Sequence, residues 1–106
     1  MKRYGQVIHV KPKKLQYYLE LHQNPWPEVI QKIKDCNIQN YSIFLLQDHT
    51  LFAYFEYIGE NFEEDMQKMA ADPMTQKWWK ETDPCQESFE INPSEWWHNM
   101  KEVFHC

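Results

Sequence analysis

The segment "YSIFLLQDHTLFAYFEYI", residues 41–58, joins two apolar runs through a short polar turn. The runs are 41–47 and 50–58, with Asp48 and His49 between them. This pattern predicts a β-hairpin, although the turn lacks the Asn-Gly pair most typical of hairpins. Both faces of each predicted strand are apolar, and a sheet of that kind must be covered on both faces. We therefore expect helices on one face and a partner sheet or a ligand cavity on the other.

Before the hairpin, the sequence predicts one strand and two short helices. Residues 4–10, "YGQVIHV", predict the strand. Pro12 suits the first turn of a helix, whose inward positions follow at i, i+3, i+4 and i+7 spacing: Leu15, Tyr18, Leu19 and His22. Pro25 and Pro27 end this helix because proline has no N–H to donate. A second helix begins near Pro27, with three residues directed inward: Val29, Ile30 and Ile33.

After the hairpin, Asn61 and Glu64 form a capping-box pair that predicts the start of a further helix. Its inward stripe contains Phe62, Met66 and Met69. Asp72-Pro73 predicts another helical turn, which presents Trp78 and Trp79. We expect an irregular loop over 81–100 and a last strand over 101–105.

The predicted order is βαββαβ with an extra helical turn after the first helix, which is the ferredoxin-like arrangement of an α+β fold. A chain of 106 residues predicts a single domain, 1–106. If two such sheets pack face to face, a homodimer buries the second apolar face of each.

Composition narrows the class of function. The net charge is −5 without a basic stripe, which argues against nucleic-acid binding. No apolar run approaches the ~18 residues of a membrane span, and two glycines cannot build a glycine-rich phosphate loop. Aromatic residues make up 16% of the chain, including five tryptophans, and such side chains line sites that bind ring-shaped ligands.

The cysteines and histidines show no known ligand spacing. Cys36, Cys85 and Cys106 are far apart and odd in number, which predicts neither a disulfide framework nor a zinc site and favours a reducing cytoplasm. We expect no signal peptide, because a long apolar stretch is missing near residue 1. The five histidines form no HExxH or His-x-His pair, so we expect no metal.

Tyr18 and His22 lie one helical turn apart, so their side chains are neighbours. They are either half-buried members of the core stripe, or a histidine that titrates near neutral pH beside a phenol that binds a substrate oxygen. The residues alone leave both interpretations open.

Trp78 and Trp79 point about 100° apart on a helix of ~3.6 residues per turn, so one buried face cannot easily take both. They are either one core and one interface residue, or a pair that stacks on a sugar. A second pair, Trp96 and Trp97, is either a lid or a dimer contact, and we favour the contact because exposed tryptophans promote aggregation.

Four motifs together resemble the L-rhamnose mutarotase family: Y-x-x-x-H-x-x-x-WPE at 18–28, NY-x-I at 40–43, WW at 78–79 and M-x-EVFH at 100–105. The resemblance implies a cofactor-free, dimeric α+β barrel. It also implies an isomerase that interconverts the α and β anomers of L-rhamnose, although a related deoxysugar such as L-fucose stays open.

Carried over to this sequence, the resemblance implies that His22 is the acid, that Tyr18 and Tyr41 bind the sugar, and that Trp78 and Trp79 contact it. Two other classes of function remain open. One is a cofactor-free monooxygenase or haem-handling enzyme, because α+β barrels also host those activities. The other is a non-catalytic sugar-binding module.

Overall fold

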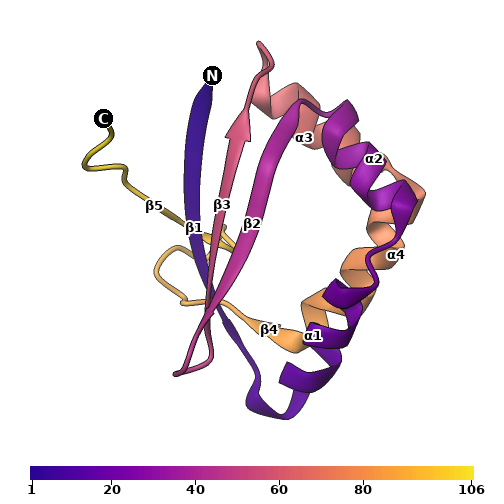
Figure 1. The fold of residues 1–106 in the computed structure, drawn as a ribbon, viewed down its shortest axis with the longest axis vertical. Helices are drawn as coiled ribbons and strands as arrows, with labels where there is room; N and C mark the ends of the chain where they lie inside the picture. Colours follow the sequence, from indigo (N-terminus) through magenta and orange to yellow (C-terminus); the bar gives the residue numbers. More distant parts are fainter.

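The computed structural model describes residues 1–106, which form a curled antiparallel sheet with helices against one face (Figure 1). The strands are β1 (Lys2–Val10), β2 (Ile38–Leu46), β3 (Thr50–Tyr57), β4 (Gln86–Glu87) and β5 (His98–Met100). The helices are α1 (Leu15–Gln23), α2 (Pro27–Asp35), α3 (Phe62–Ala71) and α4 (Pro73–Thr82), with 3-10 turns η1 (Pro12–Lys14) and η2 (Asp83–Cys85). None of these helices has the length and hydropathy that crossing a bilayer requires.

The strands are ordered β2-β3-β1-β4, and β5 also pairs with β1, at Gly5, Gln6 and Val7. Every pairing is antiparallel. This order, with α1 and α2 between β1 and β2 and with α3 and α4 after β3, is that of a ferredoxin-like fold. The predicted α+β class and βαββαβ order are therefore confirmed, and so is the hairpin of β2 and β3.

Side chains of β3 alternate between the two faces of the sheet. One face packs against the helices, and the other is partly exposed. Leu51 and Phe55 are buried, and they lie in the clusters that contact the helices. Phe52 belongs to the other face, called the outer face here, and is paired with Phe44 of β2. Phe44 is 63% exposed and Leu46 is 50% exposed, so the helices cover only one of the two apolar faces.

Two clusters of buried apolar residues lie along the inner face of the sheet. The first contains Ile8, Val10, Tyr18, Leu51 and Cys85. The second contains Ile38, Phe55 and Tyr57, and residues of α2 and α3 pack against it, including Ile33, Phe62, Met66 and Met69. Tyr18 is thus a core residue as well as a predicted site residue.

Local signals for helix ends are mostly confirmed. The side chain of Asn61 accepts a hydrogen bond of 3.1 Å from the backbone N–H of Glu64, and Pro27 is the first residue of α2. The prediction that Ile30 points inward is wrong, since it is 37% exposed while Val29 is buried. The inward stripe of so short a helix is narrow, and Val29 occupies its centre.

The predicted last strand at 101–105 is wrong, and so is the prediction of an irregular loop throughout 81–100. The β-strand lies at His98–Met100, α4 continues to Thr82, and residues 101–106 have no regular structure. Past Met100 the chain no longer pairs with β1 and turns away from it (Figure 1). One ion pair, of 2.7 Å between Arg3 of β1 and Glu102, still links this segment to the strand. The β-formers of 103–105 have no neighbouring strand to pair with, and propensity alone does not make a strand.

Candidate active site

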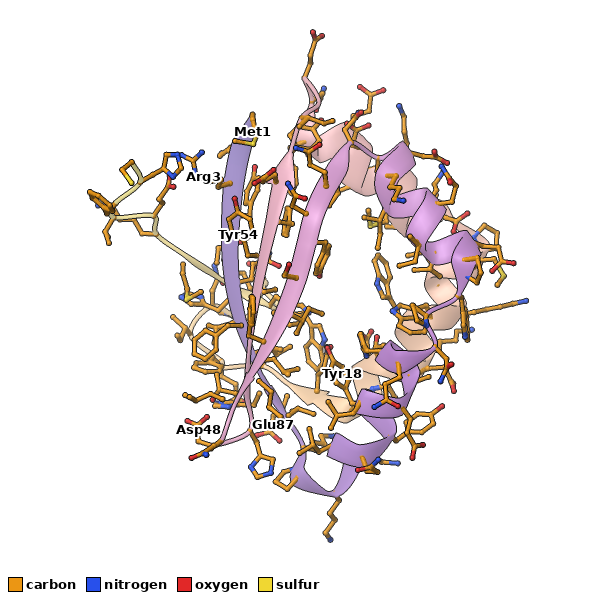
Figure 2. All side chains as sticks on the ribbon, viewed as in Figure 1. Met1, Arg3, Tyr18, Asp48, Tyr54 and Glu87 are labelled. Atoms are coloured by element: carbon orange, nitrogen blue, oxygen red, sulfur yellow. The ribbon has the colours of Figure 1, made fainter.

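Helix α1 brings Tyr18 and His22 into direct contact. Their ring centroids are 4.2 Å apart, with an interplanar angle of 32°. Tyr18 points from α1 into the region between the helices and the sheet (Figure 2). His22 is half-buried in the last turn of α1, which ends at Gln23 just before Pro25. The helical alignment of the two side chains is as expected.

The hydrogen bond of His22 fixes which ring nitrogen is free. Nδ1 lies 2.8 Å from the backbone carbonyl oxygen of Tyr18. A carbonyl oxygen only accepts, so Nδ1 carries the hydrogen and Nε2 of the neutral ring has a free lone pair. Burial lowers the pKa of His22, and the bond to the carbonyl opposes this effect without cancelling it. At neutral pH the imidazole is therefore uncharged, with Nε2 as a proton acceptor.

Two tryptophans extend this pair into an aromatic row of Tyr18, His22, Trp78 and Trp26. Trp78 lies edge-on to His22, at 5.3 Å between ring centroids and 68°, and edge-on to Trp26, at 5.2 Å and 73°. Trp79 joins none of these ring pairs and is 37% exposed, while Trp78 is 8% exposed. The structure thus brings only one of the two adjacent tryptophans into the row.

Tyr41 reaches the inner face of the sheet because β2 contains a β-bulge. The cross-strand pairs that flank the bulge are Gln39 with Glu56 and Ser42 with Tyr54, so β2 has two residues between them where β3 has one. Because side chains alternate along a strand, without this extra residue Tyr41 would face the opposite side from Ile38. The bulge instead turns Tyr41 towards the helices.

The contacts around the bulge explain the sequence Asn40-Tyr41. Asn40 has a φ of 51°, a left-handed conformation that asparagine tolerates better than most residues. The side chains of Gln39 and Asn40 both donate to Glu56, at 2.9 Å and 2.7 Å. Tyr41 stacks on Phe55 with centroids 5.4 Å apart.

The phenols of Tyr18 and Tyr41 both have raised pKa values. Burial raises the pKa of the Tyr41 phenol to about 12. Burial also raises the pKa of Tyr18, and the neighbouring Tyr41 adds to that increase. Both phenols are therefore protonated at neutral pH and serve as neutral hydrogen-bonding groups.

Three residues in or beside the aromatic row were not predicted as site residues. Trp26 appeared only as part of a motif, and the helix restart at Pro27 gave no indication that its ring would contact Trp78. Gln86 donates a hydrogen bond of 3.3 Å to the Tyr18 hydroxyl, and Trp96 donates one of 2.8 Å to Gln86. These contacts join residues 68 and 10 positions apart, and no spacing in the sequence signals them.

Two surface hollows lie away from the aromatic row. One, of about 370 Å³, is lined by the first residues of β1 and by the C-terminal segment, including Met1, Arg3 and Glu102. The other, of about 290 Å³, contains Asp48 and Glu87 (Figure 2). Neither includes a predicted site residue. Three of the predicted site residues, Tyr18, His22 and Trp78, lie together in the aromatic row instead.

No three side chains of the His, Cys, Asp and Glu types gather where they could hold a metal ion. Cys36 and Cys85 are buried free thiols, and Cys106 is an exposed one. Burial raises the pKa values of the Cys36 and Cys85 thiols, which keeps both as weakly nucleophilic thiols at neutral pH.

Comparisons with solved structures agree with the fold. An L-rhamnose mutarotase from Formosa agariphila superposes with a TM-score of 0.78 at 28% identity, and the match covers 100% of this chain and 99% of that one. Tetracenomycin F2 cyclase from Streptomyces glaucescens, a type-II polyketide cyclase, gives a TM-score of 0.69 at 11% identity. The second likeness shows the shared α+β fold alone.

Sequence comparisons identify the family. Proteins named L-rhamnose mutarotase from Oceanobacillus iheyensis and Bacillus subtilis are 38% and 34% identical to this chain, each over 99% of its length and 98% of their own. The family profile described as L-rhamnose mutarotase matches residues 3–106. The chain therefore belongs to the L-rhamnose mutarotase family.

Proposed function

We propose that this protein is an isomerase of carbohydrate metabolism that interconverts the α and β anomers of L-rhamnose, with His22 as the group that moves the proton. The observation that carries the proposal is the half-buried imidazole of His22, whose Nδ1–H is engaged by the Tyr18 carbonyl and whose Nε2 is free. This group lies beside phenol and indole rings in a member of the L-rhamnose mutarotase family.

Anomers exchange through the open-chain aldehyde. A proton leaves the anomeric hydroxyl, the bond between C1 and the ring oxygen breaks as the C1 carbonyl forms, and the ring oxygen gains a proton. Ring closure on the other face of C1 reverses these changes, so nothing is oxidised and no proton is consumed. The step needs one group that accepts a proton and then returns it, which is general acid–base catalysis worth typically ~10²–10⁴-fold.

His22 has the properties that this cycle requires. Because burial lowers its pKa, the resting imidazole is neutral and Nε2 first accepts the proton. The imidazolium formed in that step is the acid that the family resemblance implies: it gives the proton to the ring oxygen as the ring opens, and both transfers run in reverse when the ring closes.

The neighbouring rings suit a neutral sugar. Trp78 and Tyr18 flank the imidazole, and aromatic faces pack against the C–H groups of a sugar. Tyr18, and Tyr41 on the facing strand β2, offer neutral hydroxyls. We propose that these residues bind the sugar, and that Trp79 contacts it from the more exposed side of α4.

Saturation-transfer NMR on L-rhamnose, with and without the protein, tests this function. The proposal expects faster exchange between the two anomeric signals with the protein present, and a smaller acceleration or none with L-fucose and D-galactose. Sugar binding without faster exchange would instead favour a non-catalytic binding module. No acceleration with any of the three sugars contradicts the proposal.

We further propose that two copies of the chain form a homodimer through the outer faces of their sheets. Phe44 and Leu46 are exposed there in a single copy, next to Phe52. Val103 and Phe104 of the C-terminal segment are also exposed. A second copy would cover these apolar groups, and isologous dimers are the commonest oligomers.

The proposed compartment is the cytoplasm. Its support is that all three cysteines are free, including the exposed Cys106, since reducing conditions keep thiols unpaired.

A further inference from the structure

We propose that Gln86 and Trp96 are positioning residues that hold the Tyr18 hydroxyl as a hydrogen-bond donor towards the sugar. This inference rests on the proposed function, because it concerns how the same site binds its substrate. It assigns a role to two residues that lie outside the row of rings and that no motif indicated.

The three side chains form one continuous chain of hydrogen bonds. Trp96 Nε1 donates to Gln86 Oε1 at 2.8 Å, and Gln86 Nε2 donates to the Tyr18 hydroxyl oxygen at 3.3 Å. Gln86 is buried in β4, where it pairs with Val10 of β1. A buried amide with both ends occupied has one fixed orientation, so it cannot adapt to a substrate by rotating.

The direction of the chain follows from the chemistry of its first member. An indole N–H only donates, so the amide of Gln86 must present its oxygen to Trp96 and its NH₂ group to Tyr18. The Tyr18 oxygen is consequently an acceptor from Gln86. Its own hydrogen cannot point at that NH₂ group and is directed away from β4.

Tyr18 therefore complements His22. The Nδ1–H of His22 is engaged by the Tyr18 carbonyl, and Nε2 accepts. One turn of α1 thus presents a donor at Tyr18 and an acceptor at His22, with ring centroids 4.2 Å apart. A sugar fits this polarity when its ring oxygen, which gains negative charge on opening, faces Tyr18 and its anomeric hydroxyl faces His22.

The sharpest test uses the variant Gln86→Glu. The rate of L-rhamnose exchange is measured for the variant and for the parent over a range of pH, and the ratio of the two rates is compared at each pH. A protonated carboxyl has an O–H that replaces the amide NH₂, whereas an ionised carboxylate only accepts and takes the Tyr18 hydrogen for itself. Burial raises the pKa of such a carboxyl above its ordinary ~4.3. We expect the ratio to fall as pH rises through that pKa. A ratio that is constant over pH overturns the proposal.

Gln86→Met and Trp96→Phe separate positioning from packing. Gln86→Met should lower the exchange rate by about 2- to 10-fold, as expected for one neutral hydrogen bond, and Trp96→Phe should cause a smaller loss. Neither should lower the rate further in a Tyr18→Phe background, because residues that act as a unit are not additive. Losses that multiply in the double variants overturn the proposal.

A readout without substrate keeps the inference distinct from the proposed function. In ¹⁵N–¹H spectra, the Trp96 indole N–H, assigned by its loss in Trp96→Phe, should exchange slowly with water in the parent and faster in Gln86→Met. Equal exchange in both proteins overturns the hydrogen-bond chain whatever the activity is. If the Trp96 indole is protected in the parent but the parent does not accelerate L-rhamnose exchange, the hydrogen-bond chain exists and the proposed function is contradicted. The role of that chain in sugar binding is then contradicted as well.

Discussion

Asn40 donates a hydrogen bond of 2.7 Å to Glu56, beside the bulge through which β2 turns Tyr41 towards the helices. Glu56 also accepts from Gln39 and Tyr54, and these hydrogen bonds lower the pKa of its carboxyl, so it stays an ionised acceptor at neutral pH. The position of one proposed sugar-binding residue thus depends on a polar cluster on the outer face of the sheet.

Asn40→Val should lower the free energy of unfolding by about 1–2 kcal/mol, because a β-branched residue is strained in the left-handed region that Asn40 occupies. Chemical denaturation measures this change. Asn40→Gly is the matched control, since glycine adopts the same φ without strain, and it should stay closer to the parent. If valine and glycine give equal stability, the φ of Asn40 does not limit the fold.

The exchange rate should decrease as the solution is made acidic, below the ordinary histidine pKa of 6.5. The pKa of His22 is lowered, so the folded protein holds the imidazole neutral at a pH where the unfolded chain already binds the proton. Below its own pKa the imidazole is protonated and Nε2 cannot accept. NMR titration of the His22 ring should give the same pKa as the acidic limb of the rate, and a His22 pKa at or above 6.5 contradicts this account.

Stability should depend on pH in the same direction. A depressed histidine pKa means that the unfolded state binds more protons, so stability is lost as pH falls through the unfolded value of about 6.5. His22→Gln removes the titrating group and should flatten this part of the curve of unfolding free energy against pH. An unchanged slope in that variant would assign the effect to another group.

Trp78→Ala and Trp79→Ala should differ sharply, although the residues are adjacent. Trp78 is buried against His22 and Trp26, so its truncation should cost about 3–5 kcal/mol of unfolding free energy. Trp79 is more exposed, so its truncation should cost ~1 kcal/mol or less. A raised KM for L-rhamnose in Trp79→Ala, with kcat retained, would support its proposed sugar contact, and an unchanged KM would remove Trp79 from the site.

Phe44→Glu should convert the proposed dimer to monomers, because it places a charge in the centre of the apolar outer face. Size-exclusion chromatography with light scattering measures the mass directly. Ile30→Glu is the control, since Ile30 is exposed on α2, on the side of the molecule away from the outer face. A monomeric parent, or a Phe44→Glu variant that remains dimeric, contradicts the proposed interface.

The sequence predicted most of the elements because their signals are local. Pro27 at the start of α2, the Asn61 cap and the apolar runs of β2 and β3 each depend on neighbours within a few residues. Tyr18 and His22 could be paired for the same reason, since a helix fixes the distance between residues four apart.

The parts that the sequence did not reveal depend on distant contacts. The bulge at Asn40 arises only when β2 pairs with β3. The hydrogen bonds that join Gln86 to Tyr18 and to Trp96 arise only once β4, α1 and the segment after β4 are assembled. The prediction of the last strand at 101–105 was wrong for a similar reason. Residues 101–105 have suitable propensity, but β1 pairs with His98–Met100 instead.

The most direct test of the central claim compares L-rhamnose anomer exchange in the parent, His22→Gln and His22→Ala by saturation-transfer NMR, with thermal unfolding recorded for each. If the His22 imidazole moves the proton, both variants should remain folded and lose about 10²–10⁴-fold of the protein-dependent rate. Glutamine forms hydrogen bonds but cannot shuttle a proton, so it should not restore the rate. Exchange as fast as the parent in folded His22→Ala would contradict the account.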